Sequence, residues 1–76
     1  MTLELYGMAS CPYTGDLREW LELRGILFTE YDVEADVAAR DRLRALPGAP
    51  RIVPVLVENG DVTQVGWEGR GCAIPE

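Results

Sequence analysis

The junction of a strand and a helix at Cys11 constrains this chain more than any other feature of its sequence. Residues 3–6 alternate apolar and polar side chains, which is typical of a short strand, and residues 7–10 break that pattern as a loop. Pro12 suits the first position of a helix, where its missing N–H costs nothing, and apolar residues follow it at helical spacing. The sequence therefore places Cys11 at or next to the N-cap of a helix.

A cysteine in this position is a candidate nucleophile. Unpaired backbone N–H groups and the positive end of the helix dipole would face its sulfur, and such sites favour the thiolate. Thr14 lies one turn further on the same face, so we expect its hydroxyl to donate a hydrogen bond to the thiolate. A lone cysteine is most often a small buried apolar residue. The combination of Pro12, Thr14 and the strand–loop–helix context favours a reactive centre, and Thr14 closes the Cys-x-x-Cys dithiol reaction to this motif.

The overall composition predicts one globular domain spanning residues 1–76. Apolar residues make up 47% of the chain and charged residues 26%, which matches an ordinary soluble protein rather than a disordered one. No apolar run approaches the length of a membrane span, and residues 1–4 lack the basic start of a secretory signal. We therefore expect a cytoplasmic protein that does not bind membranes.

Charge and cysteine content narrow the function classes further. The net charge is −6 and the chain has neither lysine nor histidine, which argues against nucleic-acid binding and against histidine-assisted catalysis. Cys11 and Cys72 are too few for a disulfide scaffold and too widely separated for a zinc-ligand pair. We expect a small thiol protein kept reduced in the cytosol, with no bound metal.

The middle of the chain predicts a second strand and a second helix. Residues 27–33 are rich in aromatic and β-branched side chains, so they complete a βαβ unit whose two strands are parallel. Residues 36–46 form a helix that opens on Asp36 as its N-cap. Its arginines could suggest a phosphate site, but a solvated face that pairs with Asp36 and Asp41 is the favoured interpretation.

The last third predicts a hairpin and then an irregular end. Two β-type runs, residues 52–58 and 62–65, flank Asn59-Gly60, which is a strong hairpin signal. Residues 66–76 are glycine-rich and too short for a substantial helix. The predicted order is therefore β-α-β-α-β-β.

The run Cys11-Pro12-Tyr13-Thr14 resembles the Cys-Pro-Tyr-Cys active site of glutaredoxins, with threonine in place of the second cysteine. The order and spacing of the elements resemble the glutaredoxin branch of the thioredoxin fold over nearly the whole chain. The active-site run and the closing Gly-Arg-Gly-Cys also resemble a small bacterial glutaredoxin-like subgroup. The resemblance implies an α/β, thioredoxin-like fold with a four-stranded mixed sheet in the order 2-1-3-4 and a short or missing C-terminal helix.

The resemblance also implies a set of site residues. In glutaredoxins a cis-proline preceded by valine faces the active cysteine, and the backbone before that proline pairs with the cysteine of glutathione. The residues that stand in the family's glutathione-binding positions are Tyr13, Arg51, Val53, Pro54, Gly66, Trp67 and Glu68. Many glutaredoxins have a pair of aspartates that bind the γ-glutamyl amine, and this chain has Glu68 and Gly69 in their place. Near Met8, many glutaredoxins have a lysine, which this chain lacks. Trp67 is equally suited to covering the sheet.

The function implied by the resemblance is a thiol–disulfide oxidoreductase with glutathione as co-substrate. In the preferred interpretation, Cys11 attacks glutathionylated or disulfide-bonded proteins by a monothiol mechanism, as a monomer. A dithiol variant uses Cys72 as a resolving cysteine, although an unreactive Cys72 is favoured over it. Two further alternatives are an iron–sulfur binding module, like the glutaredoxins with Cys-Gly-Phe-Ser, and an adaptor without turnover.

Overall fold

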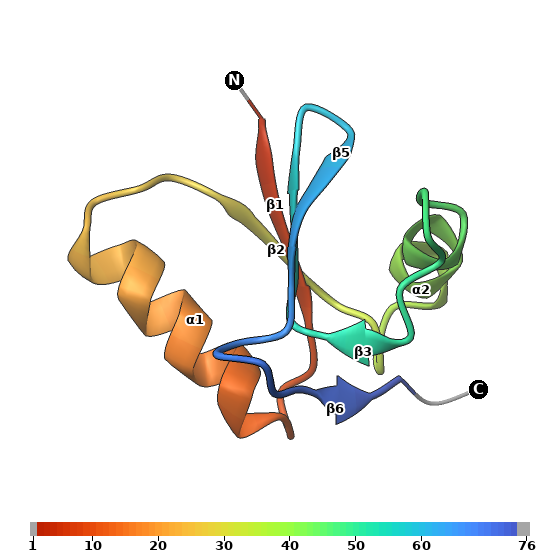
Figure 1. Cartoon of the computed structure of the whole chain (residues 1–76), viewed down its shortest axis with the longest axis horizontal. Coiled ribbons are helices and arrows are strands. Elements are labelled where there is room, and N and C mark those ends of the chain that lie inside the picture. The colour runs from red at the N-terminus through yellow and green to blue at the C-terminus, as the bar shows by residue number, and fades with distance from the viewer. Residues whose placement is uncertain (1, 75–76) are drawn as a thin grey trace.

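The computed structural model describes residues 2–74 and consists of a central sheet with one helix on each face (Figure 1). The elements, in chain order, are β1 (Leu3–Gly7), α1 (Pro12–Leu23), β2 (Thr29–Asp32), α2 (Val37–Arg44), β3 (Ile52–Val53), β4 (Val55–Glu58), β5 (Asp61–Val65) and β6 (Cys72–Ala73). The short strands β3 and β6 form a separate pair at one end of the sheet, close to the start of α1 (Figure 1).

The central sheet has the order β2-β1-β4-β5. β1 pairs with β2 in parallel and with β4 antiparallel, and β4 pairs with β5 antiparallel. This confirms the thioredoxin-like fold and its four-stranded mixed sheet. The third predicted strand, residues 52–58, is divided by Pro54 into β3 and β4, because a proline has no N–H for a strand ladder.

The alternation of side chains along the strands divides the core into two clusters, one on each side of the sheet. Leu5 of β1 belongs to the cluster that also contains Leu17 and Leu21 of α1. Tyr6 belongs to the other cluster, which contains Ala39 and Leu43 of α2. This second cluster also includes Cys11 and Val53, so the candidate active site is continuous with the core on the α2 side.

Local sequence signals predicted both ends of α1 and the start of α2. α1 starts at Pro12, and Gly25, with φ 68°, takes the left-handed conformation just after the C-cap. α2 starts after Asp36, whose carboxylate accepts a hydrogen bond of 3.1 Å from the Ala39 N–H. The predicted extent of residues 36–46 is too long at its end, because the helix stops at Arg44.

The second strand is shorter than predicted. β2 contains Thr29–Asp32, and Leu27 lies before it with 91% of its surface exposed. The apolar side chain of Leu27 therefore belongs to the connection after α1 and not to the sheet. Asn59 and Gly60 both have positive φ, 53° and 86°, which confirms the predicted two-residue hairpin between β4 and β5.

Within the described residues, no helix follows β5, in agreement with the predicted short or missing C-terminal helix. The chain instead returns as β6 and pairs with β3, an arrangement that the sequence did not predict. Among the same residues, no helix has the length and apolar character needed to cross a membrane.

Candidate active site

Cys11 is the N-cap residue of α1, as predicted. Its backbone is extended, with φ −92° and ψ 114°, and Pro12 begins the helix. The Cys11 N–H donates to the carbonyl of Met8 at 3.0 Å, and the Gly15 N–H donates to the Cys11 carbonyl at 3.3 Å. These bonds fix the backbone while the sulfur is left at the open end of the helix. Only 3% of the residue is exposed, and it belongs to the core cluster on the α2 side of the sheet.

The C-terminal segment brings Cys72 to Cys11. β6 runs antiparallel to β3, and Cys72 stands opposite Val53 in this register. The two cysteines form a disulfide with their Cα atoms 5.9 Å apart, within the usual range for such a bond. In this structure Cys72 is the covalent partner of Cys11, the pairing that the dithiol alternative requires.

Val53 and Pro54 lie beside the disulfide. The Val53–Pro54 peptide bond is cis, as the family resemblance implies, and both residues are buried. The Val53 carbonyl oxygen lies 3.9 Å from the Cys11 sulfur. On the other side, the Pro54 carbonyl accepts a hydrogen bond of 2.7 Å from Gly66, which ties the end of β5 to the proline.

The loop after β5 is a tight reversal that directs the chain back to the active site. Trp67 and Arg70 exchange backbone hydrogen bonds of 2.7 and 2.9 Å, and Glu68 and Gly69 between them have φ of 51° and 79°. Glu68 is exposed at the tip of this turn. Its predicted contact with a γ-glutamyl group stays a prediction.

Trp67 has the structural role that the sequence analysis weighed against substrate binding. Its side chain is half-buried against the core cluster on the α1 side. It also meets Trp20 edge-on, with the ring centroids 6.3 Å apart. Trp67 thus covers part of the core between the sheet and α1.

Thr14 is fully buried one turn after Cys11. Its hydroxyl accepts a hydrogen bond of 3.3 Å from the Met8 N–H. The close approach of this side chain requires a glycine at position 7, since a Cβ there would lie 2.2 Å from the Thr14 methyl group. Thr14 therefore fixes the loop that carries Cys11, and its predicted hydrogen bond to a Cys11 thiolate remains a prediction.

Comparison with known proteins agrees with this geometry. The sequence model of the glutaredoxin family matches residues 3–63. The chain belongs to the glutaredoxin family. Membership indicates thiol–disulfide oxidoreductase chemistry and accounts for the strand–cysteine–helix junction and the cis-proline in one fold.

Two solved structures are similar to this glutaredoxin-family chain. The thioredoxin-like protein BC3987 is 30% identical and has a TM-score of 0.78, with 88% of this chain and 89% of that chain covered. A single-residue mutant of the same protein is also 30% identical and has a TM-score of 0.79, with 88% and 83% covered. None of the curated proteins compared with the chain matches it.

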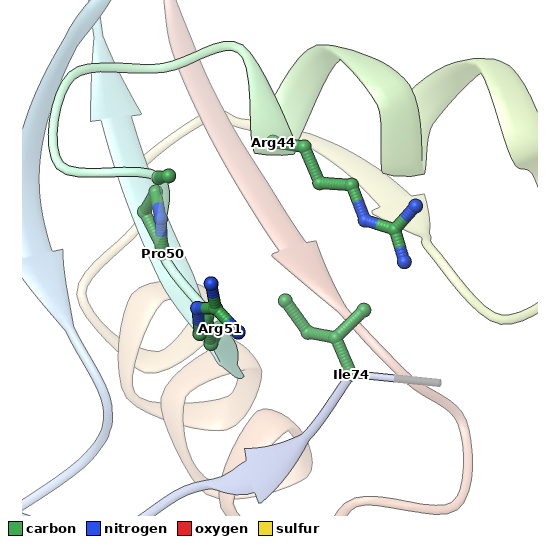
Figure 2. Close-up of a pocket in the computed structure, with 5 residues that line it drawn as sticks. Arg44, Pro50, Arg51 and Ile74 are labelled. Carbon is green, nitrogen blue, oxygen red and sulfur yellow. The ribbon is translucent and has the colours of Figure 1, made fainter. Parts of the chain in front are cut away.

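Two further residues with a predicted role in glutathione binding are Tyr13 and Arg51. Tyr13 is half-buried against the core cluster that contains Cys11. Arg51 is exposed and lines a cavity of about 410 Å³ together with Arg44, Ala49, Pro50 and Ile74. Figure 2 shows that Arg44 comes from the end of α2 and that the Ile74 side chain points toward it from the end of β6. The sequence did not predict that Ile74 and Arg44 line this cavity with Arg51, because that arrangement depends on where the C-terminal segment lies.

The arginines of α2 differ in part from the predicted solvated face. Arg42 lies over the ring of Tyr31, 4.7 Å from its centroid. A hydrogen bond with Tyr6 is the main cause that raises the pKa of Arg42, and the charge of Asp36 adds to it. Arg42 thus links α2 to two aromatic rings of the sheet.

Among residues 2–74, no group of three or more histidine, cysteine, aspartate or glutamate side chains is arranged to hold a metal ion. The pairing of Cys11 with Cys72 is the chemistry that the described residues display.

Proposed function

We propose that this protein is a thiol–disulfide oxidoreductase in which Cys11 is the nucleophile and Cys72 the resolving cysteine. The observation that carries the proposal is the Cys11–Cys72 disulfide, held at the N-cap of α1 by the pairing of β6 with β3. A helix N-terminus stabilises the Cys11 thiolate, which makes Cys11 the better nucleophile and the better leaving group of the pair.

The reaction consists of two exchanges. The Cys11 thiolate attacks one sulfur of a substrate disulfide, so a Cys11–substrate disulfide forms and the other substrate sulfur leaves as a thiolate. The Cys72 thiolate then attacks the Cys11 sulfur, which forms the Cys11–Cys72 disulfide and releases the second substrate thiolate. The substrate gains two electrons and the protein loses two. Two molecules of an external thiol, such as glutathione, return the protein to its dithiol form: the first attacks the Cys11 sulfur and releases the Cys72 thiolate, and the second attacks the resulting mixed disulfide, releases the Cys11 thiolate and leaves with the first as their disulfide.

A monothiol mechanism with glutathione is the second candidate, and Thr14 in the place of a second active-site cysteine favours it. In that case β6 leaves β3, and the cysteine of glutathione pairs with the backbone of Val53 instead. Tyr13 would line the glutathione-binding groove, and Arg51 would hold a glutathione carboxylate. Gly66, Trp67 and Glu68 would lie near the γ-glutamyl end, and the Cys-Pro-Tyr-Thr run with the closing Gly-Arg-Gly-Cys is in keeping with a small bacterial glutaredoxin-like subgroup.

The physiological setting is proposed from the composition and charge of the chain and from the family to which it belongs. Disulfide-bonded or glutathionylated proteins are the partners, glutathione is the co-substrate, and the protein acts as a cytoplasmic monomer that binds neither nucleic acid nor membranes. An iron–sulfur module would need the Cys11 sulfur as a ligand, and the disulfide engages that sulfur.

The experiment is to expose the reduced protein briefly to oxidised glutathione and to measure the intact mass, with peptide mapping of the products. Wild type should lose two hydrogens and contain a Cys11–Cys72 bond, whereas Cys72→Ser should retain one glutathione on Cys11. A lasting glutathione adduct on wild-type Cys11 would favour the monothiol mechanism. If Cys11 stayed unmodified while the unfolded protein reacted, both mechanisms would be wrong.

A further inference from the structure

The C-terminal segment lies on the β3 edge in the manner of a bound peptide. Cys72 stands opposite Val53 and Ala73 opposite Ile52, and the Ile74 N–H donates to the Arg51 carbonyl at 3.1 Å. This segment is extended, paired by backbone hydrogen bonds and joined to Cys11 through a cysteine. A substrate polypeptide caught as a mixed disulfide with Cys11 would have the same three properties.

We propose that the reduced protein binds, on the edge of β3, an extended polypeptide with the pattern Gly-Cys-x-aliphatic, in the register that residues 71–74 now hold. The inference rests on the proposed thiol–disulfide exchange at Cys11 and adds the sequence class of its protein substrate. The segment 71–74 is then a built-in competitor that must leave β3 before the substrate binds.

Glycine before the cysteine is required by the backbone of β3. A Cβ on Gly71 would lie 2.6 Å from the Val53 carbonyl oxygen and 2.9 Å from the Ile52 Cδ1 atom. The first of these atoms is backbone in a buried residue, so it cannot move aside as a flexible side chain would. Any substrate in this register meets the same two atoms, and every amino acid other than glycine brings the Cβ.

The two positions after the cysteine differ in burial. Ala73 is exposed, so the corresponding substrate residue is unrestricted. Ile74 is half-buried against the core cluster that contains Cys11 and Val53, and it lines the cavity of about 410 Å³ between α2 and the chain before β3 (Figure 2). Two arginines, Arg44 and Arg51, line the cavity beside Ile74, so the apolar contact of Ile74 is the one with the core cluster. This packing favours an aliphatic side chain two residues after the cysteine.

The test uses the full-length Cys72→Ser protein, whose only thiol is Cys11, and a set of pentapeptides. The parent peptide is acetyl-Arg-Gly-Cys-Ala-Ile-amide with its cysteine in a disulfide with 5-thio-2-nitrobenzoate. The Cys11 thiolate attacks the peptide sulfur, the Cys11–peptide disulfide forms, and the aromatic thiolate leaves and is measured by its absorbance. Because the leaving group is the same throughout, the rate reports recognition of the peptide. Each rate is divided by the rate of the same peptide with free cysteine.

We expect the peptide with alanine in place of glycine to react about tenfold more slowly than the parent, as a clash worth about 1.4 kcal/mol would cause. Serine in place of isoleucine should slow the reaction about fivefold, because the buried aliphatic contact is lost. Serine in place of alanine, at the exposed position, is the matched control and should leave the rate unchanged. Equal normalised rates for all four peptides would overturn the inference and leave the exchange chemistry of Cys11 intact. Failure of Cys11 to react with any peptide faster than free cysteine would overturn the proposed function as well.

A second variant tests the competition directly. Adding Ile74→Ser to Cys72→Ser weakens the hold of the chain's own segment on the cavity, so the parent peptide should react several times faster than with Cys72→Ser alone. An unchanged rate would mean that residues 71–74 do not occupy the peptide site, and the proposed register would be wrong.

Discussion

At the scale of single residues, Gly7 is set by the side chain of Thr14. A Cβ at position 7 would lie 2.2 Å from the Thr14 methyl carbon and 2.8 Å from its hydroxyl oxygen, at the buried end of β1 just before the loop that carries Cys11. We expect Gly7→Ala to lower the free energy of unfolding by about 1–3 kcal/mol, the usual cost of overpacking. Urea denaturation with a spectroscopic probe measures this value.

The matched control for this prediction is Gly15→Ala. Gly15 is inside α1, and the nearest atom to a Cβ there is an Arg18 nitrogen at 4.0 Å. Alanine should stabilise the helix by about 0.5–1 kcal/mol. Adding Thr14→Ala to Gly7→Ala should restore part of the lost stability. Equal effects of the two alanine substitutions would mean that Thr14 does not exclude a side chain at position 7.

At the scale of elements, Asp36 determines where α2 begins. Its carboxylate accepts the 3.1 Å hydrogen bond from Ala39, one of the N–H groups that the first turn of a helix leaves unpaired. Asp36→Ala should destabilise the protein by about 1 kcal/mol, and Asp36→Asn by much less, because the amide oxygen can accept the same bond. Thermal unfolding measures both values. Asp41→Ala, on the exposed part of the same helix, is the control, and a loss equal to that of Asp36→Ala would contradict the capping role.

An ion pair between Arg18 and Glu30 joins α1 to β2. Two hydrogen bonds of 2.6 and 2.5 Å join the guanidinium to both carboxylate oxygens, and they are the main cause that raises the pKa of Arg18. The pair is partly exposed, so Glu30→Gln should cost at most about 1 kcal/mol, and the difference should shrink at high salt. A loss that stayed constant between low and high salt would show that screening by ions does not act on this pair.

The elements show how far local sequence signals reach. The ends of α1, the cap of α2 and the turn at Asn59-Gly60 each depend on residues within one or two turns of chain, and the sequence predicted all three. β6 has two residues, too few for any periodic pattern, and its partner β3 lies about twenty residues earlier in the chain. The approach of Ile74 to Arg51 depends on that pairing, so neither could be derived from spacing along the sequence.

At the scale of the whole molecule, the Cys11–Cys72 bond joins the start of the first helix to the last described strand. Cys11 was predicted as a nucleophile from its local context, but its covalent partner is 61 residues away, and only the complete fold brings the two together. Val53 and Pro54 were assigned to the site through the family resemblance alone. The fold places Val53 opposite Cys72 and its carbonyl oxygen 3.9 Å from the Cys11 sulfur, so the site is assembled from three distant parts of the chain.

The Cys11–Cys72 bond closes a loop of the chain between residues 61 apart, which makes the stability of the protein depend on its redox state. In the chain-entropy account, closing a loop of this length removes enough freedom from the unfolded chain to stabilise the folded state by about 4 kcal/mol. A protein of 76 residues buries a small core, so this contribution is large relative to its total stability. We expect the reduced protein to unfold at a clearly lower urea concentration than the oxidised one, as followed by circular dichroism with and without a reductant. The Cys72→Ser variant should match the reduced protein and should not respond to reductant.

Coinciding curves for the oxidised and reduced wild type would show that the bond between Cys11 and Cys72 does not constrain the unfolded chain, and the structural role assigned to it here would be wrong.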